Sequence, residues 1–316
     1  MPDALTPEVR AALNDCREII TKGSKSFSLA AKLFDAQTRD AAVFLYGWCR
    51  YCDDQVDDAG KAADRAELER RLQALRDKTA SAFSFEAQPE PVFTALQYIV
   101  HRYGIPAHYA LELIEGMAMD VRETRYATLR ELLLYCYRVA GTVGLMMSHV
   151  MGLRNESALK HAADLGIAMQ LTNIARDIVE DAAMGRIYLP LSWLAEAGIE
   201  PPEIAASHNR EKLALLTRRL LREADSYYRS GDAGLWHLSF RSAAAVAAAR
   251  QVYSEIGSLI LSRGAHAWDQ RGYVTGGRKF WVVLRGVLGL LRSAPSRLFH
   301  PWSPGALRTI WKYSNV

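Results

Sequence analysis

The segment that most constrains the fold is Gln170-Leu171-Thr172-Asn173-Ile174-Ala175-Arg176-Asp177-Ile178-Val179-Glu180-Asp181. Its apolar residues recur with the period of a helix. Asn173, Asp177 and Asp181 are four residues apart, so they share one face of that helix. The apolar residues between them predict that the helix is largely buried, and buried carboxylates need a compensating partner.

A second acidic segment has the same helical spacing. It reads Arg50-Tyr51-Cys52-Asp53-Asp54-Gln55-Val56-Asp57-Asp58 and follows Phe44, Leu45, Tyr46 and Trp48. Asp53 and Asp57 therefore also share a helix face. Two carboxylates about 6 Å apart in an effective dielectric near 20 repel each other by about 3 kcal/mol. Oxygen ligands in such a setting suit Mg²⁺ carrying a phosphate-bearing substrate. The alternative is that each cluster lies on a solvated helix face, as most acidic pairs do.

Basic and aromatic residues near these clusters favour a diphosphate substrate. Arg50 and Arg176 could bind phosphate oxygens in a fork, the alternative being an ordinary intrahelical salt bridge. The segment Gly23-Ser24-Lys25-Ser26-Phe27 combines a glycine turn, two hydroxyls and a lysine, which suits a phosphate, although Walker-loop spacing is missing. A diphosphate that leaves creates a carbocation, which aromatic rings and hydroxyl dipoles stabilise. The tyrosines available for this are Tyr46, Tyr135, Tyr137 and Tyr253.

Composition excludes several other classes. The 316 residues are 50% hydrophobic, enough for a sizeable core, and the net charge of +4 with no recognition motif argues against nucleic acid as a partner. The four scattered cysteines favour a reducing compartment. Neither a secretory signal nor an apolar run of transmembrane length is visible, so a cytoplasmic location is expected. The chain has no H-E-x-x-H, no G-x-S-x-G and no dinucleotide-binding turn.

Helical periodicity predicts an all-α, single-domain bundle spanning residues 1–276. The predicted helices cover about 7–21, 26–34, 37–58, 63–82, 90–103, 107–121, 128–152, 156–182, 208–229 and 240–269, with shorter ones at 190–196 and 278–292. Ser24 and Thr128 are the predicted N-caps. The alanine-rich stretch 243–249 predicts either a close helix contact or small side chains that line a cavity.

The C-terminal extension, residues 277–316, differs in composition from the rest. No Asp or Glu follows Asp269, and basic residues alternate with Phe280, Trp281, Trp302 and Trp311. This pattern fits peripheral contact with the inner face of the cell membrane. A solvated, irregular tail is the alternative.

Taken together, the motifs resemble the squalene/phytoene synthase family, and within it the bacterial enzymes that make phytoene. The resemblance runs from Gly23 to about Tyr273. It also includes Tyr135-Cys136-Tyr137-Arg138-Val139-Ala140-Gly141-Thr142-Val143-Gly144 and Gly185-Arg186-Ile187-Tyr188-Leu189-Pro190. It implies an isoprenoid-synthase helical bundle around a central cavity. There, two geranylgeranyl diphosphates condense head to head through prephytoene diphosphate to 15-cis-phytoene, releasing diphosphate, in carotenoid biosynthesis. No NAD(P)H is implied, and association with other carotenoid-pathway enzymes is a further expectation.

The resemblance also implies roles for individual residues. The Mg²⁺ ligands, or Mn²⁺ ligands in their place, would be Asp53, Asp57, Asn173, Asp177 and Asp181, with Asp54, Asp58 and Glu180 belonging to the same motifs. Substrate would be bound by Lys25, Ser26, Phe27, Arg50, Asn173, Arg176, Tyr253 and Arg271. Tyr46, Tyr135 and Tyr253 would line the path of the cation, and Gln170 would lie near the reacting centre.

The choice of substrate length depends on Ala31, which follows Ala30. Relatives that join farnesyl chains can carry a bulky aromatic there, so a small residue predicts a longer tunnel for twenty-carbon substrates. The alternative is that the alanines only pack against another helix. Three other functions remain open: a squalene- or dehydrosqualene-type synthase using farnesyl diphosphate, a non-catalytic helical scaffold, and a terpene cyclase. The intact acidic motifs disfavour the scaffold, and segments 23–27 and 140–144 fit a cyclase poorly.

Overall fold

The computed structural model describes residues 5–23, 31–57 and 65–269, and this part of the chain is built from helices without strands. The α-helices are α1 (Pro7–Gly23), α3 (Ala36–Asp57), α4 (Arg65–Ser81), α5 (Pro91–Tyr103), α6 (Ala107–Val121), α7 (Leu129–Cys136), α8 (Thr142–Val150), α9 (Glu156–Ala183), α10 (Leu191–Glu196), α11 (Arg210–Gly234) and α12 (Phe240–Arg263). The predicted all-α class is therefore confirmed. Ser24, the helix predicted at 278–292 and the extension 277–316 lie outside the described residues.

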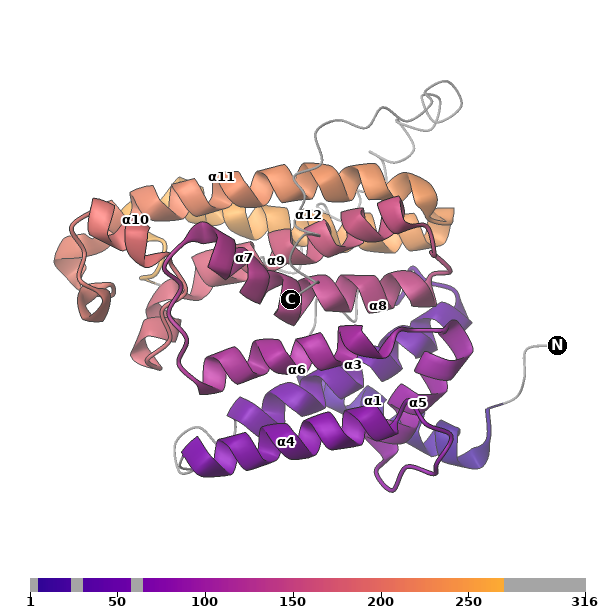
Figure 1. The fold of residues 1–316 in the computed structure, drawn as a ribbon. Coiled ribbons are helices and arrows are strands. Elements are labelled where there is room, and N and C mark those ends of the chain that lie inside the picture. Colours follow the sequence, from indigo (N-terminus) through magenta and orange to yellow (C-terminus); the bar gives the residue numbers. More distant parts are fainter. Residues whose placement is uncertain (1–4, 24–30, 58–64, 270–316) are drawn as a thin grey trace.

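The helices form a bundle with α9 near its centre. Figure 1 shows α11 and α12 along one side of the molecule, α1, α3, α4 and α5 along the opposite side, and α6 and α8 between them. Helix α9 packs against α8, α11 and α12. It buries residues around much of its circumference, as expected for a helix with neighbours on several sides. None of the helices in these residue ranges has the length and apolar composition needed to cross a membrane.

Local sequence signals account for where these helices start. The Asn155 side chain caps α9 by accepting the backbone N–H of Ser157 at 2.9 Å. The predicted cap at Thr128 is confirmed, because its hydroxyl accepts the backbone N–H of Glu131. Glu131 in turn accepts the N–H of Ala127, the residue before the N-cap, at 2.8 Å, so the two side chains together hold the start of α7.

Two predicted helices end earlier than expected, and the helix predicted over 208–229 continues to Gly234 in α11. The helix expected to reach residue 34 does not, because residues 32–34 form a turn. Asp35 then accepts the backbone N–H of Thr38 at 2.9 Å and starts α3. The helix expected to reach residue 269 ends at Arg263. Gly264 follows it with a φ of 57°, which ends the regular helix, and a 3-10 turn continues to His266.

The helix predicted over 128–152 is also interrupted, by a π-helical turn at Tyr137–Gly141 between α7 and α8. The backbone of this region touches α9. A Cβ on Gly166 of α9 would lie 2.3 Å from the carbonyl oxygen of Ala140, and a Cβ on Gly144 would lie 2.5 Å from that of Ala162. Such an approach is open only to glycine, and π-turns of this kind are frequent at functional sites.

Replacing Gly166 by alanine is therefore expected to destabilise the protein by about 2–3 kcal/mol, because backbone atoms would have to move apart. The measurement is the free energy of unfolding in denaturant. Gly257→Ala in α12 is the matched control, since its new Cβ would come no closer than 3.3 Å, to a terminal methyl of Leu221. We expect that control to change stability by no more than about 1 kcal/mol. Equal effects of the two changes would contradict the close-contact explanation.

Candidate active site

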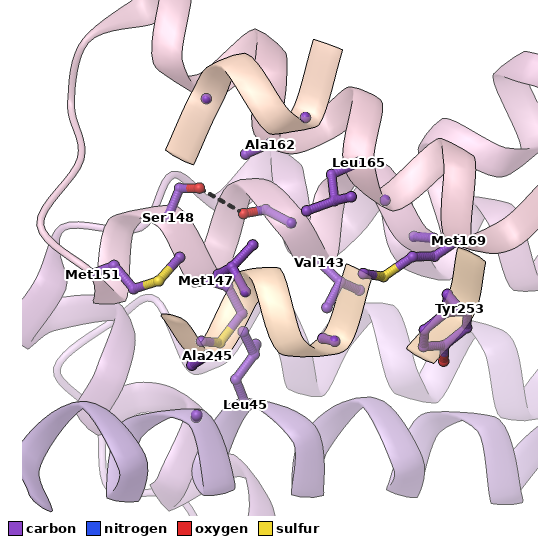
Figure 2. Close-up of a pocket in the computed structure, with 18 of the residues that line it drawn as sticks. Leu45, Val143, Met147, Ser148, Met151, Ala162, Leu165, Met169, Ala245 and Tyr253 are labelled. Atoms are coloured by element: carbon purple, nitrogen blue, oxygen red, sulfur yellow. Dashed lines mark hydrogen bonds between the residues drawn. The ribbon is translucent and has the colours of Figure 1, made fainter. Parts of the chain in front are cut away.

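A cavity of about 460 Å³ lies between α3, α8, α9 and α12. Figure 2 shows Leu45 of α3 across this cavity from Leu165 of α9. On α9 the lining residues follow one helix face, from Ala158 to Asn173. At 1.5 Å per residue this face is about 22 Å long. The cavity is therefore an elongated chamber whose long axis follows α9.

The two ends of the chamber differ in chemistry. One end carries the polar residues Tyr46, Asp53, Gln170, Asn173 and Tyr253. The other end is mainly apolar, with Ser148 and His161 as its polar exceptions, and includes Ala31, Phe34, Ala42, Met147, Met151, Ala158, Leu238 and Ala245. Figure 2 places Tyr253 and Met151 at opposite ends. A ligand with a polar head and a long apolar tail matches this division.

The helical spacing of the sequence produces this division directly. On α3 the lining runs through one face from Ala42 to Asp53, and on α12 from Ala245 to Tyr253. Each helix thus brings its polar residue to the same end. The alanine-rich stretch 243–249 was predicted to make a close helix contact or to line a cavity, and it does both. Ala243 and Ala247 pack in a buried cluster. Ala245, Ala248 and Ala249 line the chamber.

Asn173 has a buried oxygen that is available to a ligand. Its Nδ2 donates to Oε1 of Gln170 at 3.2 Å. Its Oδ1 is buried and has no hydrogen-bond partner among the described residues. Buried polar atoms are normally paired, so this amide oxygen at the polar end is a candidate cation ligand.

The next two turns of α9 carry the acidic residues of the motif. The Arg176 guanidinium donates two hydrogen bonds to the Asp177 carboxylate, from Nε to Oδ1 at 2.8 Å and from Nη2 to Oδ2 at 2.5 Å. Burial and the nearby charge of Asp177 raise the pKa of Asp181 to about 7. A cation beside Asp181 would lower that pKa and favour the ionised carboxylate.

The acidic residues of α3 are only partly described. Asp53 lines the cavity, and Asp57 is the last residue of α3. Arg50 pairs with Asp54 at 2.6 Å along the same helix, which is the salt bridge considered as the alternative for this arginine. Within residues 5–23, 31–57 and 65–269, no three acidic, histidine or cysteine side chains converge as a ready metal site.

Tyr135 occupies a different place from the one expected by resemblance. It is not among the described residues that line the chamber. Its hydroxyl donates to Oδ2 of Asp120 at 2.8 Å and lies 3.2 Å from the hydroxyl of Tyr188. Sequence analysis missed Asp120, because no other acidic residue of α6 lies three or four positions from it to mark a shared helix face. The one available signal was that both tyrosines belong to segments shared with the family.

The structure thus brings together five of the predicted site residues at the polar end, namely Tyr46, Asp53, Gln170, Asn173 and Tyr253. Arg176, Asp177 and Asp181 continue from there along α9. The remaining predicted residues, Lys25, Ser26, Phe27, Asp58 and Arg271, lie outside the described part of the chain.

Comparison with known proteins identifies this arrangement. The fold is similar to the crystal structure of a dehydrosqualene synthase in complex with ligand, with a TM-score of 0.82 and 26% identity, covering 90% of this chain and 98% of that one. The bundle is thus an isoprenoid-synthase fold. The squalene/phytoene synthase family model matches residues 20–278, and the chain belongs to this family.

Two curated bacterial relatives are similar to this chain over most of its length. A 15-cis-phytoene synthase from Pantoea ananas is 46% identical over 299 residues, covering 92% of this chain and 97% of that protein. A 15-cis-phytoene synthase from Enterobacter agglomerans is 50% identical over 254 residues, covering 79% of this chain and 86% of that protein.

Proposed function

We propose that the protein is a phytoene synthase, which condenses two geranylgeranyl diphosphates head to head through prephytoene diphosphate to 15-cis-phytoene. The observation that carries the proposal is the chamber itself, whose lining face runs for about 22 Å along α9, with acid and amide groups at one end and mainly apolar residues over the rest. It fits a prenyl diphosphate lying with its head at Asp53 and Asn173 and its tail toward Ala31. The two bacterial relatives support phytoene as the product.

The donor set at the polar end fits a divalent cation. The Oδ1 of Asn173, which has no partner in the described part of the chain, and the raised pKa of Asp181 are both features that a bound cation would relieve. We assign Mg²⁺, or Mn²⁺ in its place, to Asp53, Asn173, Asp177 and Asp181, with Asp57 included by its position at the end of α3. When bound, the ion neutralises charge on the departing diphosphate.

The residues of the chain would then act as follows. Arg176, and Arg50 on the facing helix, bind diphosphate oxygens and hold the leaving group in place. The rings of Tyr46 and Tyr253 stabilise the allylic cation at the polar end of the chamber. The apolar walls keep water from this cation, so the second prenyl chain attacks it instead. This attack and the loss of one proton give the cyclopropyl intermediate, which ionises in the same space by releasing the second diphosphate, rearranges and loses a second proton.

The same residues favour a twenty-carbon substrate over farnesyl diphosphate. Ala31 is 5% exposed and lines the apolar end, beside Phe34, Ala42 and Ala245. A small side chain there leaves room for the last isoprene unit. This supports the tunnel interpretation of Ala31 over simple helix packing.

The direct test is incubation of the purified protein with geranylgeranyl diphosphate and Mg²⁺, followed by identification of the hydrocarbon product. We expect phytoene, with no requirement for NADPH. Efficient turnover of farnesyl diphosphate alone would favour a squalene-type synthase, and no product from either substrate would favour a scaffold.

For location, we propose a peripheral association with the inner face of the cell membrane through the extension 277–316, and contact there with other carotenoid-pathway enzymes. Basic and aromatic residues of the extension support this. Deleting 277–316 should reduce co-sedimentation with anionic liposomes. Unchanged co-sedimentation would rule out this anchoring role.

A further inference from the structure

Three tyrosine rings and one carboxylate form a compact cluster beside the polar end of the chamber. Tyr126, Tyr135 and Tyr188 pack with ring centroids 5.0 to 6.2 Å apart. Asp120 of α6 accepts one hydroxyl on each of its oxygens, from Tyr188 to Oδ1 and from Tyr135 to Oδ2, both at 2.8 Å. All three rings are buried. The cluster joins α6 and α7 to the segment that follows α9.

This cluster borders the proposed site. Tyr135 lies one helical turn before Val139, which lines the chamber. The charge of Asp120 contributes to the raised pKa of Asp181. Tyr188 belongs to the shared segment Gly185–Pro190, which directly follows α9 and for which the proposed mechanism gives no role.

Both bonds to Asp120 are of the strong, charge-assisted kind. Burial, followed by the nearby Asp120 charge, raises the pKa of Tyr135 well above its usual value, so the hydroxyl stays protonated and donates. The same two causes raise the pKa of Tyr188. A carboxylate that accepts a hydroxyl on each of its oxygens has a fixed orientation.

We propose that Tyr188 is a positioning residue for the condensation: its hydroxyl and that of Tyr135 bind the two oxygens of Asp120, and this bridge fixes α7, which leads to the chamber residue Val139, against the segment that follows the acidic end of α9. The inference rests on the proposed function and explains why the segment after α9 carries a buried tyrosine. Tyr188 acts through Asp120 and Tyr135 and does not touch substrate.

Tyr126 of the same cluster provides a control for the Tyr188→Phe variant. The hydroxyl of Tyr126 is buried in the same ring cluster, but it has no hydrogen-bond partner among the described residues. Tyr126→Phe therefore removes a hydroxyl from the same environment without breaking the bonds to Asp120. Tyr188→Phe removes a hydroxyl that holds Asp120.

The test compares kcat and KM for geranylgeranyl diphosphate in Tyr188→Phe, Tyr126→Phe, Tyr135→Phe and the Tyr135→Phe/Tyr188→Phe double variant, with thermal unfolding of each. For Tyr188→Phe we expect kcat to fall about tenfold, as outer partners of active-site groups typically give, with KM within about twofold. Tyr126→Phe should match the wild type. The kcat of the double variant should be no lower than that of Tyr135→Phe alone, because the two changes break the same bridge through Asp120.

A kcat of Tyr188→Phe equal to that of Tyr126→Phe would overturn the proposal, and so would fully additive losses in the double variant. If Tyr188→Phe does not fold, the kcat of Asp120→Asn is compared with that of Tyr126→Phe instead. The asparagine side chain has one acceptor oxygen, so it cannot accept both tyrosine hydroxyls on separate oxygens. A wild-type kcat in that variant would also overturn it. A wild-type protein that makes no phytoene would instead refute the proposed function, so the two failures are distinguishable.

Discussion

Replacing Asp53 or Asp177 by asparagine is expected to lower kcat for phytoene formation by about 10²- to 10³-fold, or about 3–4 kcal/mol of barrier. Asp53 lines the polar end on α3, and Asp177 lies one turn beyond Asn173 on α9. Each change removes one negative charge with little change of shape. The loss should therefore come from weaker stabilisation of the departing diphosphate. Steady-state kinetics over a range of Mg²⁺ concentrations would measure it.

Asp40→Asn is the matched control for these variants. Asp40 lies on the same helix as Asp53 but pairs with Arg17 of α1 at 2.9 Å, away from the chamber. Its replacement should leave kcat and the Mg²⁺ requirement unchanged. Near-normal turnover by Asp53→Asn or Asp177→Asn would argue against the assigned metal and diphosphate site.

The second large effect is expected from Ala31→Phe. A phenyl ring at this buried position would fill the apolar end of the chamber next to Phe34 and Met147. We expect phytoene formation to fall by about tenfold or more, since lost pocket space is worth about 1–3 kcal/mol or more for each group excluded. Turnover of farnesyl diphosphate should stay within about threefold of the wild type, because its shorter tail ends before this position.

The two substrates serve as internal controls for each other. General damage from overpacking would affect both, and its cost of about 1–3 kcal/mol would appear in thermal unfolding. An equal loss with both substrates would show that Ala31 acts in helix packing and does not limit chain length.

Most helices could be predicted from sequence because their apolar residues follow the helical period over many turns. The predicted ranges 37–58 and 156–182 agree with α3 and α9 to within one residue at each end. The π-turn at Tyr137–Gly141 could not be predicted. It accompanies a backbone contact between Ala140 and Gly166, which are far apart in the sequence. Local periodicity contains no information on such a contact.

For the candidate site, the sequence predicted which residues share a helix face, but it did not predict how the helices are arranged around the chamber. Four-residue spacing placed Asn173, Asp177 and Asp181 on one helix face, and the same rule applied to Asp53. That α3 and α9 face each other across a chamber depends on tertiary packing, and only resemblance to a known family indicated it. The Asp120 cluster was missed because its bonds join residues from three separate segments.

The central claim is that the prenyl diphosphate lies with its head between α3 and α9 and its tail at Ala31. A crystal structure with Mg²⁺ and a thio-substituted geranylgeranyl diphosphate tests it most directly. We predict metal-bound phosphates against Asp53, Asn173 and Asp177, and the last isoprene unit beside Ala31 and Met147. A head group bound elsewhere, with these side chains facing solvent, would contradict the account.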